Sequence, residues 1–210
     1  MQKIVIFDMD GTLIDSKKDI TISVNYVRKM NHNLPPLGED FIVDVINREV
    51  RNLAQLFYNT PIYEERDKKI FEKHYKEQCI ENPYVYDGVK DILHILKDNN
   101  VKLSVATNAP TPFAKTMLEH LHVKNLFDLV IGADKVENSK PNPEMIHKIL
   151  DYYNYNTNQD SAWMVGDNVK DMKSAKNAGI KEVFAAWGFS TFSTYPVIVK
   201  HPKEILSIVL

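Results

Sequence analysis

Two aspartates, Asp8 and Asp10, stand one residue apart directly after a short apolar run, and Gly11 follows them. Carboxylates this close repel each other, and a hard cation such as Mg²⁺, which takes oxygen ligands, removes that cost. Glycine at position 11 allows the chain to turn with a positive φ or to pass close to a ligand. One interpretation of the stretch is therefore a cation site formed by Asp8 and Asp10 at the end of a strand. The alternative is a strand that ends in a turn with two solvated aspartates.

A second pair of carboxylates, Asp167 and Asp171, follows another apolar run late in the chain. Asp167 comes directly after the run, and Asp171 lies four residues later, at the start of a predicted helix. In open α/β sheets the carboxyl ends of the strands share one edge, so both aspartate pairs are expected there. Asp171 alone could also simply favour the N-terminal end of its helix, where negative charge is stabilising.

Other polar groups are predicted at the same edge. Thr107 and Asn108 follow the predicted strand Lys102–Ala106. A hydroxyl, an amide and backbone N–H groups entering a helix can cradle a phosphate, although Thr-Asn is also a common helix cap. Lys140 is followed by prolines at positions 141 and 143, which hold it on a stiff segment. A lysine before proline is otherwise normally a surface residue.

The elements that carry these residues alternate between strands and helices. Apolar runs typical of buried strands recur along the chain at Lys3–Phe7, Lys102–Ala106, Phe127–Gly132, Ala162–Gly166, Glu182–Ala186 and Val197–Val199. Helical patterns separate most of them, which predicts a parallel sheet with right-handed crossovers. The expected fold class is therefore α/β, with a Rossmann-like doubly wound parallel sheet.

One long segment has no strand-like run. Its helical patterns include one around Phe41–Phe57 and one around Tyr63–Cys79. We expect residues 16–82 to form a small all-helical cap, and residues 1–15 and 83–210 to form the α/β core. Such a cap could close over the carboxylates and exclude water, whereas the alternative is a helical decoration without a catalytic part.

Two local predictions concern the ends of core elements. Asp87 is a plausible N-cap for the helix that begins near Val89. The stretch Trp187-Gly188-Phe189 is predicted to be a turn after a strand, and no role is assigned to the Ser190 that follows it.

Composition limits the classes of protein. The 210 residues are 44% hydrophobic and 26% charged, which is ordinary for a globular protein, and the net charge of −2 gives no basic footprint for nucleic acid. No apolar run approaches about 18 residues, so we expect no membrane partner and no leader segment. Cys79 is the single cysteine, so a reducing, cytoplasmic setting is expected. Both a monomer and a homodimer stay open.

Taken together, four segments resemble the motifs of the haloacid dehalogenase-like (HAD) hydrolases, in the expected order and over nearly the whole chain. They are Asp8-Met9-Asp10-Gly11-Thr12, Thr107, Lys140-Pro141-Asn142-Pro143, and Gly166-Asp167 with Asp171. The resemblance implies an α/β core and, as in many members, a helical cap after the first motif.

The resemblance also implies roles. Asp8 would attack phosphorus and form an aspartyl-phosphate, and Asp10 would act as acid and base. Mg²⁺ would be bound by Asp8, Asp10 and Asp167, with Asp171 in support through a water or the second shell. The phosphate would be bound by residues from all of the first three motifs, namely Gly11, Thr107, Asn108 and Lys140.

Within the family, the acid at Asp10 favours phosphatases and phosphomutases over the dehalogenases, which lack it. The layout looks most like the phosphoglycolate phosphatases, which implies a small phosphate ester such as 2-phosphoglycolate as substrate. A sugar phosphomutase similar to β-phosphoglucomutase, a pyrophosphatase and a non-catalytic binding protein are the alternatives. In the cap, Arg48 or Arg51 could clamp a substrate carboxylate, although solvated helix-face arginines are commoner.

Overall fold

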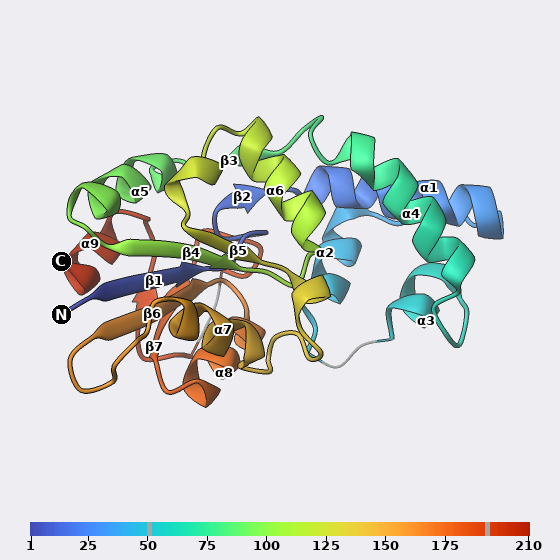
Figure 1. The fold of residues 1–210 in the computed structure, drawn as a ribbon. Coiled ribbons are helices and arrows are strands. Elements are labelled where there is room, and N and C mark those ends of the chain that lie inside the picture. Colours follow the sequence, from blue (N-terminus) through green and yellow to red (C-terminus); the bar gives the residue numbers. More distant parts are fainter. Residues whose placement is uncertain (50–51, 192–193) are drawn as a thin grey trace. The chain divides into compact units, whose positions relative to one another are not determined.

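The computed structural model describes residues 1–49, 52–191 and 194–210, and the chain divides into two compact units (Figure 1). The core unit comprises Met1–Asp15 and Val85–Leu210, and the helical unit comprises Ser16–Tyr84. The expected boundary at residues 82 and 83 lies two residues from this division.

The core unit is built on a parallel sheet of six strands in the order β5-β4-β1-β6-β7-β8. Their bounds are β1 Lys3–Phe7, β4 Lys102–Ala106, β5 Leu129–Ile131, β6 Ser161–Gly166, β7 Lys181–Ala185 and β8 Ile198–Val199. Ile4 of β1 lies opposite Lys102 on one side and Ala162 on the other. The first strand of the chain is therefore at the centre of the sheet, with both of its edges hydrogen bonded.

Helices cover both faces of this sheet. In Figure 1, α5 and α6 lie on one side of the strands and α7 and α8 on the other. The helices of the core unit are α5 Val89–Asp98, α6 Thr111–His120, α7 Glu144–Tyr152, α8 Val169–Asn177 and α9 Glu204–Val209, with short 3₁₀ turns at Lys124–Leu126 and Ala133–Lys135. The doubly wound α/β fold is thus confirmed.

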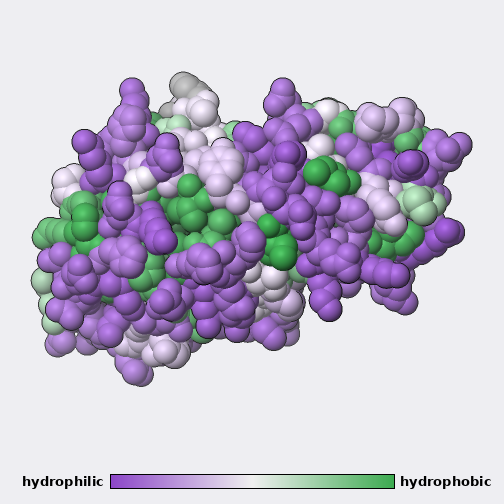
Figure 2. Space-filling model, turned by 90° about the horizontal axis from the view of Figure 1, so that it is seen from above, coloured by the Kyte–Doolittle hydropathy of each residue, from purple (hydrophilic) through white to green (hydrophobic). Residues whose placement is uncertain are grey.

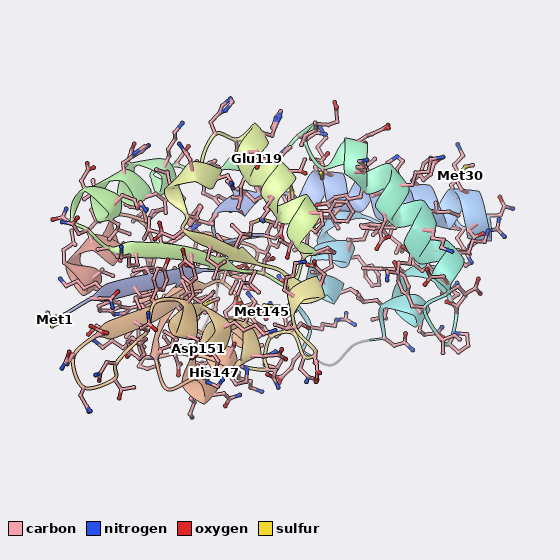
Figure 3. All side chains as sticks on the ribbon, in the orientation of Figure 1. Met1, Met30, Glu119, Met145, His147 and Asp151 are labelled. Carbon is pink, nitrogen blue, oxygen red and sulfur yellow. The ribbon has the colours of Figure 1, made fainter. Side chains whose placement is uncertain are left out.

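Helix α7 shows how the sequence pattern fixes a helix on the sheet. Met145 is fully buried in a cluster with Ile4 and Met164, whereas His147 and Asp151 are exposed on the opposite side of the helix (Figure 3). Residues three and four apart share one face of a helix, so this apolar stripe faces the sheet.

The helical unit contains α1 Lys17–His32, α2 Glu39–Asn47, α3 Leu53–Tyr58 and α4 Glu65–Gln78. Its core includes Val24, Val27, Ile42, Val45 and Phe57. The single helix expected around Phe41–Phe57 is therefore wrong, because the chain leaves the helix at Arg48 and a new helix begins after Asn52. The Asn52 side chain accepts a hydrogen bond from the Gln55 N–H at 3.1 Å and caps α3.

Two short strands, β2 Ile14–Asp15 and β3 Tyr84–Val85, pair with each other where the chain leaves the core unit and where it returns. Beside them the Tyr86 N–H donates to the Leu13 carbonyl at 3.1 Å. The two passages of the chain are therefore tied to each other by backbone hydrogen bonds.

Figure 2 shows a face on which hydrophilic residues predominate and apolar residues form smaller areas between them. Every helix in the described part of the chain is too short or too polar to cross a bilayer.

Candidate active site

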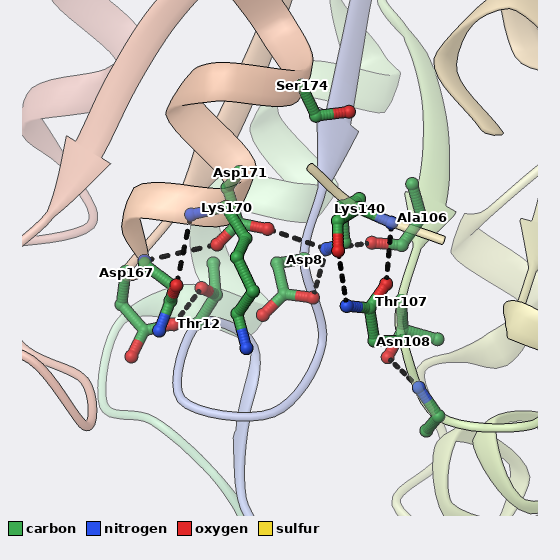
Figure 4. A network of polar contacts seen from close by, with 12 residues as sticks. Asp8, Thr12, Ala106, Thr107, Asn108, Lys140, Asp167, Lys170, Asp171 and Ser174 are labelled. Atoms are coloured by element: carbon green, nitrogen blue, oxygen red, sulfur yellow. Dashed lines mark hydrogen bonds and ion pairs between the residues drawn. The ribbon is translucent and has the colours of Figure 1, made fainter. Parts of the chain in front are cut away.

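Three neighbouring strands deliver polar residues to one edge of the sheet. Asp8 follows β1, Thr107 follows β4 and Asp167 follows β6. The ladder continues one step past the strands, since the Asp8 N–H donates to the Val165 carbonyl at 2.8 Å. Because the strands are parallel and adjacent, the side chains that follow them converge, as the close-up shows (Figure 4).

Lys140 lies at the centre of this group and is buried. Its ammonium donates to Asp8 Oδ1, to Asp171 Oδ1 and to the Ala106 carbonyl, each at 2.6 Å. Burial alone lowers the pKa of Lys140, but the charges of Asp171 and Asp8 outweigh it and raise the pKa above its ordinary value. The lysine is therefore charged and fixed against Asp8, although it precedes a proline.

Asn108 holds the backbone of this lysine. Its side-chain oxygen accepts from the Lys140 N–H at 3.0 Å, and its side-chain nitrogen donates to the Lys140 carbonyl at 2.9 Å. The neighbouring Thr107 hydroxyl accepts from the Ala109 N–H at 3.0 Å and keeps its own proton for another acceptor. The oxygen and the nitrogen of the Asn108 amide thus both position Lys140. The predicted contact of Asn108 with a phosphate stays a prediction.

Three carboxylates form a compact acidic cluster. Among the described residues, the group of side chains that could hold a metal ion consists of Asp8, Asp167 and Asp171, whose ligand atoms lie within 4.8 Å of one another and are buried. Asp10 is partly exposed just beyond β1 and is not in this group. Its predicted role as a ligand is untested.

The electrostatics of the cluster fit a cation. Burial, and then the charges of Asp8 and Asp171, raise the pKa of Asp167 well above its ordinary value. Burial and the charge of Asp8 raise the pKa of Asp171 to about 6, even though Lys140 opposes the shift. Three buried carboxylates with one lysine among them leave an excess of negative charge, and an all-oxygen donor set suits Mg²⁺.

Asp171 has a second task at the start of α8. Its Oδ2 accepts from the Asn168 N–H at 3.1 Å, and the Asn168 side chain accepts from the Lys170 N–H at 3.0 Å. This reciprocal capping box fixes the first turn of the helix. Asp171 therefore caps the start of α8 and also belongs to the acidic cluster, so the two interpretations do not exclude each other.

Position 11 requires a glycine, both because its backbone has a positive φ and because a side chain would have no room there. Its φ is +88°, and a Cβ at this position would lie 2.5 Å from Asp167 Oδ2. The next residue, Thr12, donates from its hydroxyl to Asp167 Oδ1 at 3.1 Å. The Gly11 N–H donates to the Ile14 carbonyl at 2.8 Å. The predicted contact of Gly11 with a phosphate stays a prediction.

Several residues of this site were given no role from the sequence alone. Thr12 lies inside the first motif, and Lys170 lies between the two late aspartates, so their positions in the sequence could have indicated both. Lys170 is buried, and its side chain extends beside the acidic cluster (Figure 4). The loop Trp187–Ser190 also contacts Asp167, and no signal in the sequence linked it to the site.

The structure does not test the predicted role of the two arginines of the helical unit. Arg48 is exposed at the end of α2, and its Nη2 pairs with Asp44 Oδ2 at 2.6 Å within the helical unit. Arg51 lies outside the described residues. The predicted carboxylate clamp therefore stays a prediction.

Comparison with known proteins identifies relatives over nearly the whole chain. The family model of haloacid dehalogenase-like hydrolases matches residues 5–185. A phosphoglycolate phosphatase of Aquifex aeolicus (strain VF5) is 32% identical over 187 residues, which cover 89% of this chain and 86% of that protein. An N-acetylmuramic acid 6-phosphate phosphatase of Pseudomonas aeruginosa is 28% identical and covers 98% of this chain and 94% of its own length.

A similar fold is seen in a solved structure. The crystal structure of a predicted phosphoglycolate phosphatase from Haemophilus somnus 129pt superimposes with a TM-score of 0.85, at 25% identity, over 100% of this chain and 98% of the other. The similarity thus extends through the core unit and the helical unit alike.

Proposed function

Because this chain belongs to the haloacid dehalogenase-like hydrolase family, we propose that it is a Mg²⁺-dependent phosphatase that acts on a small phosphate monoester. The observation that carries the proposal is the fixed Lys140, paired with Asp8 and Asp171, beside a buried carboxylate cluster with an excess of negative charge. A carboxylate nucleophile, a fixed cation and a metal site are the parts that in-line phosphoryl transfer needs.

Asp8 is the nucleophile in this proposal. One of its oxygens attacks phosphorus, the bond to the ester oxygen breaks, and an aspartyl-phosphate forms. Asp10 donates a proton to the leaving oxygen and then removes one from the water that attacks phosphorus in the second step. Lys140 holds Asp8 in line and offsets charge on the phosphoryl oxygens, while the Thr107 hydroxyl donates to one of them.

Asp8, Asp10 and Asp167 would hold the Mg²⁺ ion, with Asp171 in support. When bound, the ion supplies positive charge that stabilises the phosphoryl oxygens in the transition state. Asp8, Asp167 and Asp171 are all buried, and burial strengthens the electrostatic interactions of their carboxylates.

For the substrate we propose a phosphorylated carboxylic acid, with 2-phosphoglycolate as the first candidate. Two relatives support this class, because the names phosphoglycolate phosphatase and N-acetylmuramic acid 6-phosphate phosphatase both specify a phosphate ester of an acid. The helical unit would act as the cap that selects the substrate, with Arg48 or Arg51 as a contact for the carboxylate.

The test is phosphate release with Mg²⁺ from a panel that contains 2-phosphoglycolate, N-acetylmuramic acid 6-phosphate, sugar phosphates, nucleotides and pyrophosphate. We expect the carboxylated esters to be preferred and Asp8→Asn to abolish turnover. Activity that persists in Asp8→Asn contradicts the nucleophile. An isomerised sugar phosphate without net phosphate release favours the phosphomutase instead, and no reaction on any compound favours a binding protein.

A further inference from the structure

The loop Trp187–Ser190, which follows β7, lies against the acidic cluster. In sequence it lies far from the first motif, since Trp187 and Thr12 are separated by 175 residues. The loop nevertheless makes three kinds of contact with the residues that carry the proposed chemistry.

The first contact is with Asp167, whose carboxylate is buried. Its Oδ2 accepts from the Phe189 N–H at 2.9 Å and from the Ser190 N–H at 3.3 Å, while its Oδ1 accepts from the Thr12 hydroxyl at 3.1 Å. Both oxygens are therefore oriented, and backbone N–H donors of the loop stabilise the charged form of the acid.

The second contact fixes Thr12 itself. The Trp187 indole Nε1–H donates to the Thr12 carbonyl at 3.0 Å. Thr12, Asp167 and the loop thus form a closed ring of hydrogen bonds. Movement of any one of these groups disturbs the other two.

The third contact is a close approach of two backbones. A Cβ at Gly188 would overlap the Gly11 carbonyl oxygen and would lie 2.9 Å from the Asp167 Cβ. Gly188 is not among the glycines with a positive φ. A glycine is therefore needed at position 188 for space, because a side chain would displace the turn of the first motif or Asp167.

We propose that the loop Trp187–Ser190 is a positioning element of the metal site, which orients Asp167 for the cation and couples that orientation to the turn that carries Asp10 and Gly11. The inference rests on the proposed function. Partners that orient a metal ligand typically change metal affinity or activity by about 10–100-fold when they are removed.

The experiment measures Mg²⁺ binding by titration calorimetry on the full chain without substrate. Gly188→Ala is expected to weaken Mg²⁺ binding by about 10–100-fold, and Trp187→Phe, which removes the indole N–H and makes the side chain smaller, to weaken it less. Gly38→Ala is the matched control, because a Cβ there meets no atom within 4 Å. In turnover assays the Mg²⁺ concentration for half-maximal activity should rise, while kcat at saturating Mg²⁺ largely recovers.

Circular dichroism in EDTA checks that the variants are folded, and Trp187→Phe decides the question if Gly188→Ala does not fold. Wild-type Mg²⁺ affinity in a folded Trp187→Phe and in any folded Gly188→Ala overturns the inference, even if phosphate esters are hydrolysed. Conversely, weaker Mg²⁺ binding in the variants of a protein that hydrolyses no phosphate ester supports the inference and overturns the proposed function.

Discussion

At the scale of single residues, Lys140 is the most constrained side chain of the site. An ammonium has three hydrogens, and here each has an acceptor at 2.6 Å. A compact cation on a flexible stem suits three acceptors around one point, whereas the planar fork of an arginine does not. A phosphoryl oxygen that approaches this ammonium must therefore share a hydrogen with Asp8, Asp171 or the Ala106 carbonyl.

Lys170 gives a prediction about charge at the same site. The three clustered carboxylates, Lys140 and a divalent ion sum to zero, so a dianionic phosphoryl group leaves two negative charges without compensation. Lys170 is buried on α8, and its charge acts on the cluster by lowering the pKa of Asp171.

We expect Lys170→Met to raise KM for the preferred ester, and the inhibition constant of inorganic phosphate, by about 10-fold or more, as for loss of a charged hydrogen bond. Lys176→Met is the matched control, because Lys176 is exposed on the same helix. Steady-state kinetics decide, and unchanged KM and phosphate inhibition in Lys170→Met contradict the role.

The acidic cluster also predicts how stability depends on pH. The pKa of Asp171 is raised to about 6 from an ordinary value of 3.8, and that of Asp167 is raised as well. The folded protein then binds these protons more tightly than the unfolded chain. The contribution of Asp171 to the free energy of unfolding is therefore present below the unfolded pKa and is lost as the pH rises through about 6, and the contribution of Asp167 has the same sign.

Mg²⁺ binds the deprotonated carboxylates, so the increase in melting temperature that it causes should be small near about pH 5 and several degrees near about pH 7.5. Thermal melts with Mg²⁺ and with EDTA measure it, with Asp167→Asn as control. An equal increase at both pH values argues against a cation at this cluster.

At the scale of elements, a buried polar contact ties α1 to α4 in the helical unit. Asp67, in the first turn of α4, is fully buried, and its Oδ1 accepts from His32 Nε2 at 2.7 Å and from Asn31 Nδ2 at 2.5 Å. Both donors lie in the last turn of α1. A carboxylate in this position can only be buried because its partners are present.

Asp67→Ala is expected to reduce the free energy of unfolding of the helical unit by about 1–3 kcal/mol, because it leaves these donors buried without an acceptor. Urea unfolding followed by circular dichroism measures the change. Glu65→Ala is the control in the same turn, since the exposed Glu65–Lys69 pair at 3.9 Å should contribute less than about 1 kcal/mol. Equal effects of the two substitutions refute a structural role for Asp67.

Sequence patterns predicted helices and strands best where neighbouring residues alone determine the bounds of the element. The strand Lys102–Ala106 was predicted with its observed bounds, because the apolar Leu103 and Val105 alternate with polar residues and no Gly or Pro interrupts the run. The N-cap prediction at Asp87 was wrong, since Gly88 with a φ of 80° occupies the cap of α5. The prediction of one helical segment around Phe41–Phe57 was wrong because the spacing of apolar residues stays helical past the point where α2 ends, at Asn47.

The candidate site was predictable for a similar reason. Asp8, Thr107 and Asp167 end neighbouring parallel strands, so their convergence follows from the topology. The approach of Gly188 to Gly11 depends instead on how two loops far apart in the sequence pack together, and no local sequence pattern predicts such packing. Asn108 was recognised for its position, but its pairing with the Lys140 backbone depends on a contact across 32 residues.

At the scale of the whole molecule, the two units differ in how the chain builds them. The helical unit comes from one continuous segment, Ser16–Tyr84, whereas the core unit needs both ends of the chain. Contacts between residues close in sequence form quickly, and pairings across long loops form slowly. We therefore expect the helical unit to form its contacts earlier in folding than the core unit, whose central strand pairs with segments far along the chain.

The central place of β1 has a consequence for synthesis. Its partner β6 ends at Gly166, so at the ribosome's rate of about 5–20 residues per second, roughly 8–30 s pass between the emergence of the two strands. For that time the apolar strand β1 lacks at least one of its two neighbours, and an unpaired strand edge with exposed apolar side chains favours aggregation. Asp8 therefore leaves the ribosome well before Asp167 and Asp171, the carboxylates with which it forms the acidic cluster.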